Sequence, residues 1–174
     1  MRQTIIIAIL SIFFSNTLGA QQWKIAENHT IAFSNSDVSG IFKDVSGIIN
    51  FDSGNLGTSK FTLKIKVESI NTGNGLQNKH AKGDEWFNAE KYPEIEFVSS
   101  KIEKTESGYK AIGILEMHGV KKDISVPFTF VKKGAKGTFV AKFKLNRIDY
   151  GVGKKGNDVG DAINITATIP VLKK

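Results

Sequence analysis

Apolar and polar residues alternate along most of this chain, and the alternation limits what it can fold into. In the segment 61–67, FTLKIKV, every second residue is apolar. Three further segments, 124–130, 139–145 and 163–171, show the same period of two. Successive side chains of a β-strand point to opposite faces, so the pattern predicts strands with one face in a core and the other in water.

The alternating segments add up to an all-β fold. Less regular strand-like segments cover 23–34, 38–52, 94–103 and 109–118. Turns rich in Gly, Asn, Ser and Asp separate these segments, and no long amphipathic helix is visible, so about eight strands with short connections are expected. The favoured architecture is an eight-stranded antiparallel up-and-down barrel, with a sandwich as the alternative. One long insertion, 71–93, predicts one or two short helices, with Asp84 as a cap for the turn 85–89.

The first twenty residues have the pattern of a secretory signal peptide. Arg2 supplies a basic start, residues 5–14 form an apolar run, and the small residues Gly19 and Ala20 suit a cleavage site. The apolar run is too short for a membrane span, which needs about 20 residues. We therefore expect residues 1–20 to be removed, with export of a single domain, 21–174, to the periplasm or beyond. An uncleaved N-terminal anchor is the alternative.

Composition argues against several functional classes. The chain has no cysteine, which excludes disulfides and thiolate chemistry, and its net charge is +7. Its lysines mostly alternate with apolar residues, which is typical of the solvated face of a sheet; attraction to an anionic membrane surface is the weaker interpretation. No nucleic-acid recognition motif accompanies the charge. The three histidines fall on separate segments, so no metal site is expected. No nucleophile motif or acid pair is found either, and we expect no catalytic residue and no enzyme activity.

One segment is more specific than the alternation. Residues 80–97 read HAKGDEWFNAEKYPEIEF, with Trp86 and Phe87 adjacent. The shorter segments GIFKDVSG (40–47), GILEMHGV (113–120) and RIDYG (147–151) occur in a matching order. In this order and spacing the chain resembles the YceI family along essentially all of residues 21–174. The resemblance implies a lipocalin-like barrel around an apolar cavity that binds polyisoprenoid and other long lipids, and a periplasmic location.

Two motifs near the end of the chain are interpreted as structural. Residues 151–156, GVGKKG, match the G-x-G-x-x-G pattern, but an alternating strand follows instead of a helix, which argues against a dinucleotide site. Arg147 and Asp149 are expected to form a structural pair in the loop before the last strand. Trp86 and Phe87 either pack one end of the barrel or line the mouth of its cavity, and the sequence leaves both readings open.

The predicted function is therefore that of an exported protein that holds an isoprenoid, an isoprenoid quinone or a fatty-acyl chain inside a barrel. Burial of a chain of roughly 20 carbons, at about 0.8 kcal/mol per methylene, can exceed an association cost of about 4–15 kcal/mol. No cofactor other than such a lipid is expected. The residues predicted to line the cavity are Phe33, Phe42, Phe51, Phe61, Leu63, Ile65, Trp86, Phe87, Ile95, Phe97, Phe128, Phe130, Phe139 and Phe143.

The alternative is an envelope stress or interaction protein with a closed barrel and a basic partner-binding surface. A homodimer is compatible with either interpretation. Segments 33–40 and 134–137 are shorter than in many YceI proteins, so the resemblance does not determine the chain length of the ligand.

Overall fold

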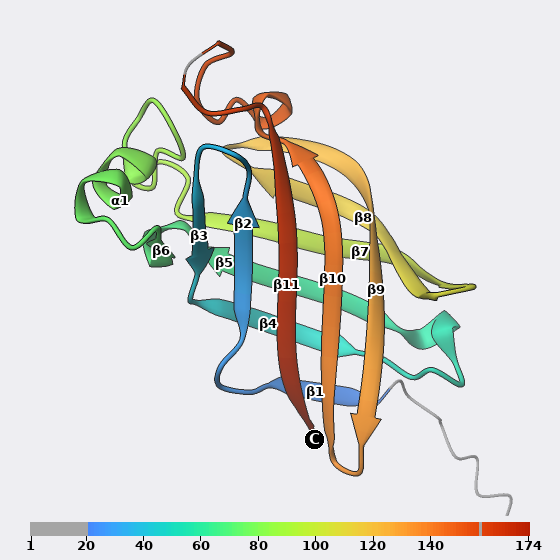
Figure 1. Cartoon of the computed structure of the whole chain (residues 1–174). Helices are drawn as coiled ribbons and strands as arrows, with labels where there is room; N and C mark the ends of the chain where they lie inside the picture. Colours follow the sequence, from blue (N-terminus) through green and yellow to red (C-terminus); the bar gives the residue numbers. More distant parts are fainter. Residues whose placement is uncertain (1–20, 157) are drawn as a thin grey trace, which may run out of the picture.

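The alternating segments form antiparallel strands that curve into a barrel in a computed structural model, which describes residues 21–156 and 158–174 (Figure 1). Within those residues one sheet contains eleven strands. They are β1 (Gln22–Ile25), β2 (Thr30–Ser34), β3 (Ser39–Phe42), β4 (Val45–Asn50), β5 (Lys60–Lys66), β6 (Ile70–Asn71), β7 (Glu94–Thr105), β8 (Gly108–Met117), β9 (Val120–Lys133), β10 (Lys136–Asn146) and β11 (Ala162–Lys173). The helical elements are α1 (Gly75–Lys82) and 3₁₀ turns at Leu56–Thr58, Val67–Ser69 and Arg147–Tyr150.

Eight of these strands close the barrel. They follow the order β1-β4-β5-β7-β8-β9-β10-β11, and β11 returns to pair with β1. The short strands β2, β3 and β6 extend one end of the ring, where β2 pairs with the other half of β11. In Figure 1 the wall of β9, β10 and β11 crosses in front of β4, β5 and β7. The predicted eight-stranded antiparallel barrel, with a helix in the long insertion, is confirmed.

The predicted signal peptide, residues 1–20, lies outside the described residues. In the part of the chain that is described, no helix combines the length and the apolar character needed to cross a membrane.

The predicted strand 23–34 is interrupted between β1 and β2, and His29 stabilises the interruption. Its Nδ1 lies 2.8 Å from the carbonyl oxygen of Ala26, and the amide of Val45 donates to its Nε2 at 3.2 Å. Because Nε2 accepts a hydrogen bond, the neutral ring carries its proton on Nδ1 and donates to Ala26. His29 thus joins the break between β1 and β2 to the first residue of β4.

A bulge in β7 helps to curve the sheet. The register against β8 shifts between Ser99 and Lys101, and the Ser99 hydroxyl accepts a hydrogen bond of 2.8 Å from the Phe61 amide. Opposite the bulge, a Cβ on Gly113 would lie only 2.2 Å from the carbonyl oxygen of Val98. A glycine is therefore required there, and the bulge bends and twists the strands as closure of a barrel demands.

The end of the barrel that contains β1 and the β9–β10 turn is filled by aromatic rings. We call this cluster the aromatic floor; its members are Trp23, Phe51, Phe61, Tyr109, Phe128, Phe130 and Phe139. Phe51 is only 1% exposed, and its ring centroid lies 5.1–6.1 Å from those of five other members. The Trp23 indole donates a 2.9 Å hydrogen bond to the Phe51 carbonyl oxygen, which fixes the backbone beneath the ring.

We predict that Phe51→Ala lowers the free energy of unfolding by about 3–5 kcal/mol, because it removes the ring that the rest of the floor packs against. Urea denaturation of the purified protein measures the change. The matched control is Val131→Ala, which truncates a side chain that is 58% exposed and should change stability by less than about 0.5 kcal/mol. Equal effects of the two substitutions would contradict the assigned role of Phe51.

Candidate ligand-binding cavity

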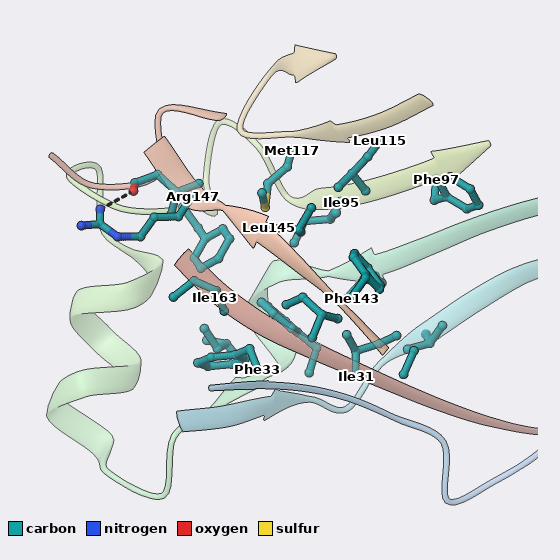
Figure 2. A pocket seen from close by; sticks show the side chains of 18 of the residues that line it. Ile31, Phe33, Ile95, Phe97, Leu115, Met117, Phe143, Leu145, Arg147 and Ile163 are labelled. Atoms are coloured by element: carbon teal, nitrogen blue, oxygen red, sulfur yellow. Dashed lines mark hydrogen bonds between the residues drawn. The ribbon is translucent and has the colours of Figure 1, made fainter. Parts of the chain in front are cut away.

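Beyond the aromatic floor the barrel is hollow. A cavity of about 550 Å³ extends from the floor toward the end of the barrel that carries α1 and the β10–β11 loop. Its wall is built from inward side chains of nearly every strand, and these are almost all hydrocarbon (Figure 2). The size is within the range of about 300–1,000 Å³ that is common for small-molecule sites. The closed barrel considered as an alternative from the sequence is therefore wrong.

Most residues predicted to face the cavity lie on its wall. They are Phe33, Phe42, Phe61, Leu63, Ile65, Trp86, Phe87, Ile95, Phe97, Phe128, Phe139 and Phe143. Phe51 and Phe130 are not on the wall but lie deeper in the aromatic floor, where the ring of Phe139 contacts both. Alternation shows which side chains point inward, but it does not show how deep each one lies along the barrel axis. Contact of the twelve with a ligand stays a prediction.

Several aliphatic wall residues were not predicted. They include Ile31, Leu115, Met117, Leu145, Ile163 and Ile165. All six lie in segments that had been recognised as strands, so their inward phase could have identified them. The prediction favoured phenylalanine and passed over these smaller side chains. Aliphatic branches and rings together form a wall without a specific shape for a rigid ligand.

The long insertion, 71–93, begins with the last residue of β6 and lines one side of the mouth. Its helix α1 is capped by Asn74, whose side chain accepts from the amides of Leu76 and Gln77. The predicted cap at Asp84 for the turn 85–89 is wrong, because the amides of Trp86 and Phe87 donate to the carbonyl oxygens of Gly83 and Ala81 instead. The turn carries Trp86 and Phe87 to the cavity wall.

Trp86 and Phe87 each contact a residue of the barrel at the mouth. The Phe87 ring meets Phe42 edge-to-face at 5.7 Å, and Phe42 in turn packs against Phe33 at 5.6 Å. The Arg147 guanidinium lies 5.2 Å from the centre of the Trp86 ring. The two open readings of Trp86 and Phe87 therefore combine: they pack the insertion onto the barrel and line the cavity at the same time.

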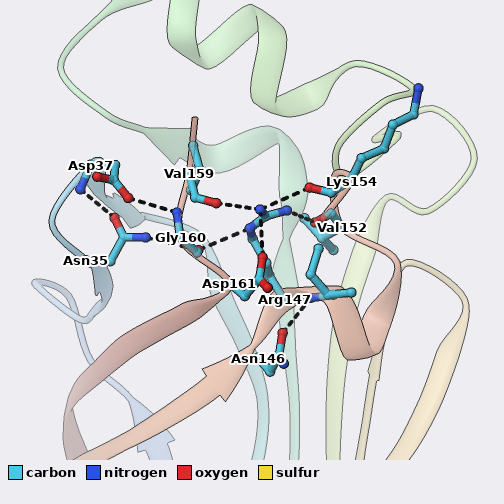
Figure 3. A network of polar contacts seen from close by, with 10 residues as sticks. Asn35, Asp37, Asn146, Arg147, Val152, Lys154, Val159, Gly160 and Asp161 are labelled. Atoms are coloured by element: carbon cyan, nitrogen blue, oxygen red, sulfur yellow. Dashed lines mark hydrogen bonds and ion pairs between the residues drawn. The ribbon is translucent and has the colours of Figure 1, made fainter. Parts of the chain in front are cut away.

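Arg147 organises the opposite side of the mouth. Its side chain is almost fully buried and donates to the carbonyl oxygens of Val152 (2.8 Å), Lys154 (3.2 Å), Val159 and Gly160 (3.2 Å) (Figure 3). A planar guanidinium with five fixed donors suits this arrangement, since one side chain holds several turns of backbone at once.

The carboxylate partner of Arg147 differs from the prediction. Its Nη2 lies 3.2 Å from Oδ1 of Asp161, so the expected structural pair with Asp149 is wrong. Asp149 belongs to the same 3₁₀ turn as Arg147, whereas Asp161 precedes β11 and returns to the arginine only when the loop folds over it. Asp149 was expected because it is nearer to Arg147 in the sequence. The path of the loop brings Asp161 to the guanidinium instead.

The glycines of the G-x-G-x-x-G match serve this loop. Gly151, Gly153 and Gly156 all have positive φ, and the 3₁₀ turn before them and β11 after them leave no helix to bind a dinucleotide. A Cβ on Gly153 would lie 2.6 Å from Nη1 of Arg147 and 3.0 Å from the Trp86 ring. The glycine pattern thus reflects a backbone wrapped closely around an arginine.

The loop is also joined to the β2–β3 turn. The Gly160 amide donates to Oδ2 of Asp37 at 2.8 Å, and the Asn35 side chain donates to the Gly160 carbonyl oxygen at 3.1 Å (Figure 3). The hydrogen bond from Gly160, with a second one from the Ser36 hydroxyl, holds the pKa of the Asp37 carboxyl below its ordinary value. These contacts fix the loop over one edge of the mouth.

The polar residues of the cavity lie at this mouth rather than on the wall beneath it. They are Asp37, Thr72, Gln77, His80, Arg147 and Asp158. Of these, Arg147 and Asp37 are bound to backbone of the loop. Within residues 21–156 and 158–174 no group of three or more His, Asp or Glu side chains could hold a metal ion. The arrangement suits a ligand with a long hydrocarbon part inside and a small polar part at the entrance.

Several known proteins are similar to this chain in sequence or in structure. A family model described as a YceI-like domain matches residues 22–171. A UPF0312 protein of Photorhabdus laumondii is 36% identical over 85 residues, which are 49% of this chain and 44% of that relative. The chain thus matches less than half the length of that relative. A UPF0312 protein of Pseudomonas savastanoi is 33% identical over 128 residues, covering 70% of this chain and 67% of the relative.

Solved structures show the same fold. Burkholderia cenocepacia BcnA superposes with a TM-score of 0.77 at 26% identity, covering 82% of this chain and 95% of that one. A Campylobacter jejuni YceI protein gives 0.73 at 30% identity, covering 81% and 88%. A polyisoprenoid binding domain from Saccharophagus degradans gives 0.63 at 14% identity, covering 89% and 99%, and this likeness concerns the fold alone.

Replacement of Arg147 by lysine tests the role of the guanidinium. We predict that Arg147→Lys destabilises the protein by about 3–5 kcal/mol. An ammonium group cannot bind all the carbonyl oxygens and the carboxylate that the guanidinium binds. Urea denaturation gives the stability, and hydrogen exchange should show lost protection in the loop before β11. Lys144→Ala, an exposed position on β10, is the control. Unchanged protection of the loop in Arg147→Lys would refute the role.

The contact between Asp37 and Gly160 predicts a pH dependence. Because the pKa of Asp37 is lowered in the folded state, the contact adds stability above the ordinary value of 3.8 and loses it as the pH falls through the lower folded value. The amide resonance of Gly160 should therefore titrate with a midpoint below 3.8 in an NMR pH series. Asp37→Asn keeps an acceptor oxygen and should abolish that titration. A midpoint above 3.8 would contradict the assignment.

Proposed function

Because this chain belongs to the YceI family, we propose that it is a lipid-binding protein that encloses one long apolar chain in its barrel. The candidate ligands are an isoprenoid, an isoprenoid quinone or a fatty-acyl chain. The observation that carries the proposal is the hollow, hydrocarbon-walled cavity of about 550 Å³, closed by the aromatic floor and polar only at its mouth. A small polar ligand would need convergent polar groups along the wall, and the wall offers hydrocarbon instead.

The energetics of such a site favour a flexible apolar chain. Each methylene removed from water contributes about 0.8 kcal/mol, so affinity grows with the length of chain that the cavity accepts. The flexible ligand can follow an irregular wall of rings and branched side chains. The Saccharophagus degradans domain, named for polyisoprenoid binding, offers support for an isoprenoid as the first ligand to test.

Binding rather than catalysis is the proposed activity. Arg147, the cavity residue best suited to polarise a substrate, is committed to the backbone of the loop and to Asp161. The residues that face the ligand space are otherwise predominantly hydrocarbon. A binding role needs no further group from the protein.

Export is part of the proposal. The basic, apolar and small-residue pattern of residues 1–20 supports secretion into the periplasm or beyond, where a carrier could move or sequester a lipid that water does not dissolve. Expression of the complete chain in a Gram-negative host, followed by fractionation and mass measurement, tests both the location and removal of residues 1–20.

Native mass spectrometry of the protein purified without detergent tests the binding directly. A stoichiometric mass increment that solvent extraction recovers as a lipid is the expected result. A bare mass that persists after incubation with prenols, quinones and fatty acids would overturn the proposal.

A pair of neighbouring substitutions separates cavity filling from general disturbance of the fold. Ala141 lies on the cavity wall, whereas Val140 is directed to the outer face, opposite Thr129 and Thr168. We predict that Ala141→Phe weakens lipid binding by about tenfold or more, because a benzyl group occupies ligand space. Val140→Phe should leave binding unchanged. Titration with a fluorescent fatty acid, alongside a thermal melt of each variant, measures both; equal affinities would contradict the assignment of the cavity.

A further inference from the structure

The aromatic floor, besides stabilising the barrel, sets the depth of the cavity. Three members, Phe61, Phe128 and Phe139, line the cavity and also contact Phe51 behind them. These three rings are the surface that the far end of a ligand would meet. We propose that they act as a ruler that limits the bound chain to about three or four isoprene units, or a fatty chain of similar volume. The inference rests on the proposed lipid-binding function and adds the size of the ligand to it.

The ruler is rigid because each layer of rings supports the next. Phe61 and Phe128 contact each other at 5.3 Å, and Phe139 stacks on Phe130 at 4.3 Å. Behind them Phe51 is 1% exposed, and the hydrogen bond from Trp23 fixes its backbone. Interiors packed in this way have few voids, so a longer chain cannot press the floor downward without breaking several ring contacts.

The volume of the cavity sets the limit. If a methylene-sized group occupies about as much space as a water molecule in the liquid, ~30 Å³, the cavity of about 550 Å³ holds about 18 such groups. An isoprene unit contributes five carbons, so farnesol, with three units, fits within this capacity, and geranylgeraniol, with four, slightly exceeds it. A chain of eight or nine units would need about twice the space and would leave its remaining units outside the mouth.

Phe139 is the residue through which the limit can be moved. It is buried on β10, lies at the cavity surface, and its ring contacts those of Phe51, Phe61, Phe128 and Phe130. Replacement by alanine removes six ring carbons, slightly more than the five of one isoprene unit. Phe139→Ala should therefore lengthen the accepted chain by about one unit.

The experiment offers the full chain, purified after export, a mixture of prenols with two to nine isoprene units from micelles of fixed composition. Native mass spectrometry then reports the occupancy by each prenol. For the unsubstituted protein we expect occupancy to rise up to three or four units and then fall by about tenfold or more for longer chains, whose excess units leave the micelle for water at the mouth. In Phe139→Ala the maximum should move by about one unit toward longer chains.

Two further variants keep the test decisive. Phe139→Leu is a milder replacement that retains aliphatic packing if the alanine variant does not fold, and it should shift the same maximum in the same direction. Val140→Ala, on the outer face next to Phe139, should not move it. Equal occupancy by four-unit and nine-unit prenols, or an unmoved maximum in a folded Phe139 variant, would overturn the ruler. Binding of no prenol and no fatty acid at all would instead overturn the proposed function, and the ruler with it.

Discussion

The hydrogen bond from the Trp23 indole to the carbonyl oxygen of Phe51 is the interaction on which the interior of this barrel depends. An eight-stranded barrel is about the size at which side chains either fill the interior or leave room for one small ligand. In this barrel side chains fill one end, and a cavity occupies the other. Around Phe51 the rings fill the space completely, and a few residues further along the same strands they do not. The rings packed around Phe51 therefore mark where the filled end of the barrel stops and the cavity begins.

The loop at the mouth is held mainly by polar contacts rather than by packed rings. The β10–β11 loop buries Tyr150 and Val152, and a guanidinium in its centre holds the rest of its backbone through hydrogen bonds. The Arg147 fork, the ion pair with Asp161 and the contact between Gly160 and Asp37 are polar interactions within a small volume, partly shielded from water. Across the opening, the insertion is held by the rings of Trp86 and Phe87 instead. One rim is thus fixed mainly by hydrogen bonds to a buried guanidinium, and the other by ring contacts together with the ion pair between Lys82 and Glu68.

Alternation predicted the fold because it is a local rule: a side chain on a strand points inward or outward according to its neighbours alone. Together with the less regular strand-like segments it predicted about eight strands and most of the wall, Phe143 and Leu63 among them. Alternation does not show how deep a side chain lies along the barrel axis. Phe51 and Phe130 were therefore predicted to line the cavity, although the cavity ends before it reaches them. The partner of Arg147 depends on how a loop folds back, which spacing in the sequence does not encode. The cap at Asn74 is a local contact with the first amides of α1, and the prediction missed it by placing the cap at Asp84. The family resemblance supplied the apolar interior, but the depth of that interior became visible only with the rings in place.

The closure of the ring has a consequence for how the chain reaches this state. β11 is the strand that joins both halves, since it pairs with β10 along its whole length and with β1 at its end, where Trp23 faces Lys173. The first and the last strand of the barrel are thus neighbours in space although about 150 residues separate them in the chain. Contacts of such high order form slowly, because the entropy of closing the loop is lost before the contact is gained. Until β11 arrives, β1 and β10 both present unpaired edges, and no partial barrel can shield the hydrocarbon interior from water. The same connectivity leaves the barrel open for as long as its final strand is withheld, a condition compatible with the export proposed for this chain.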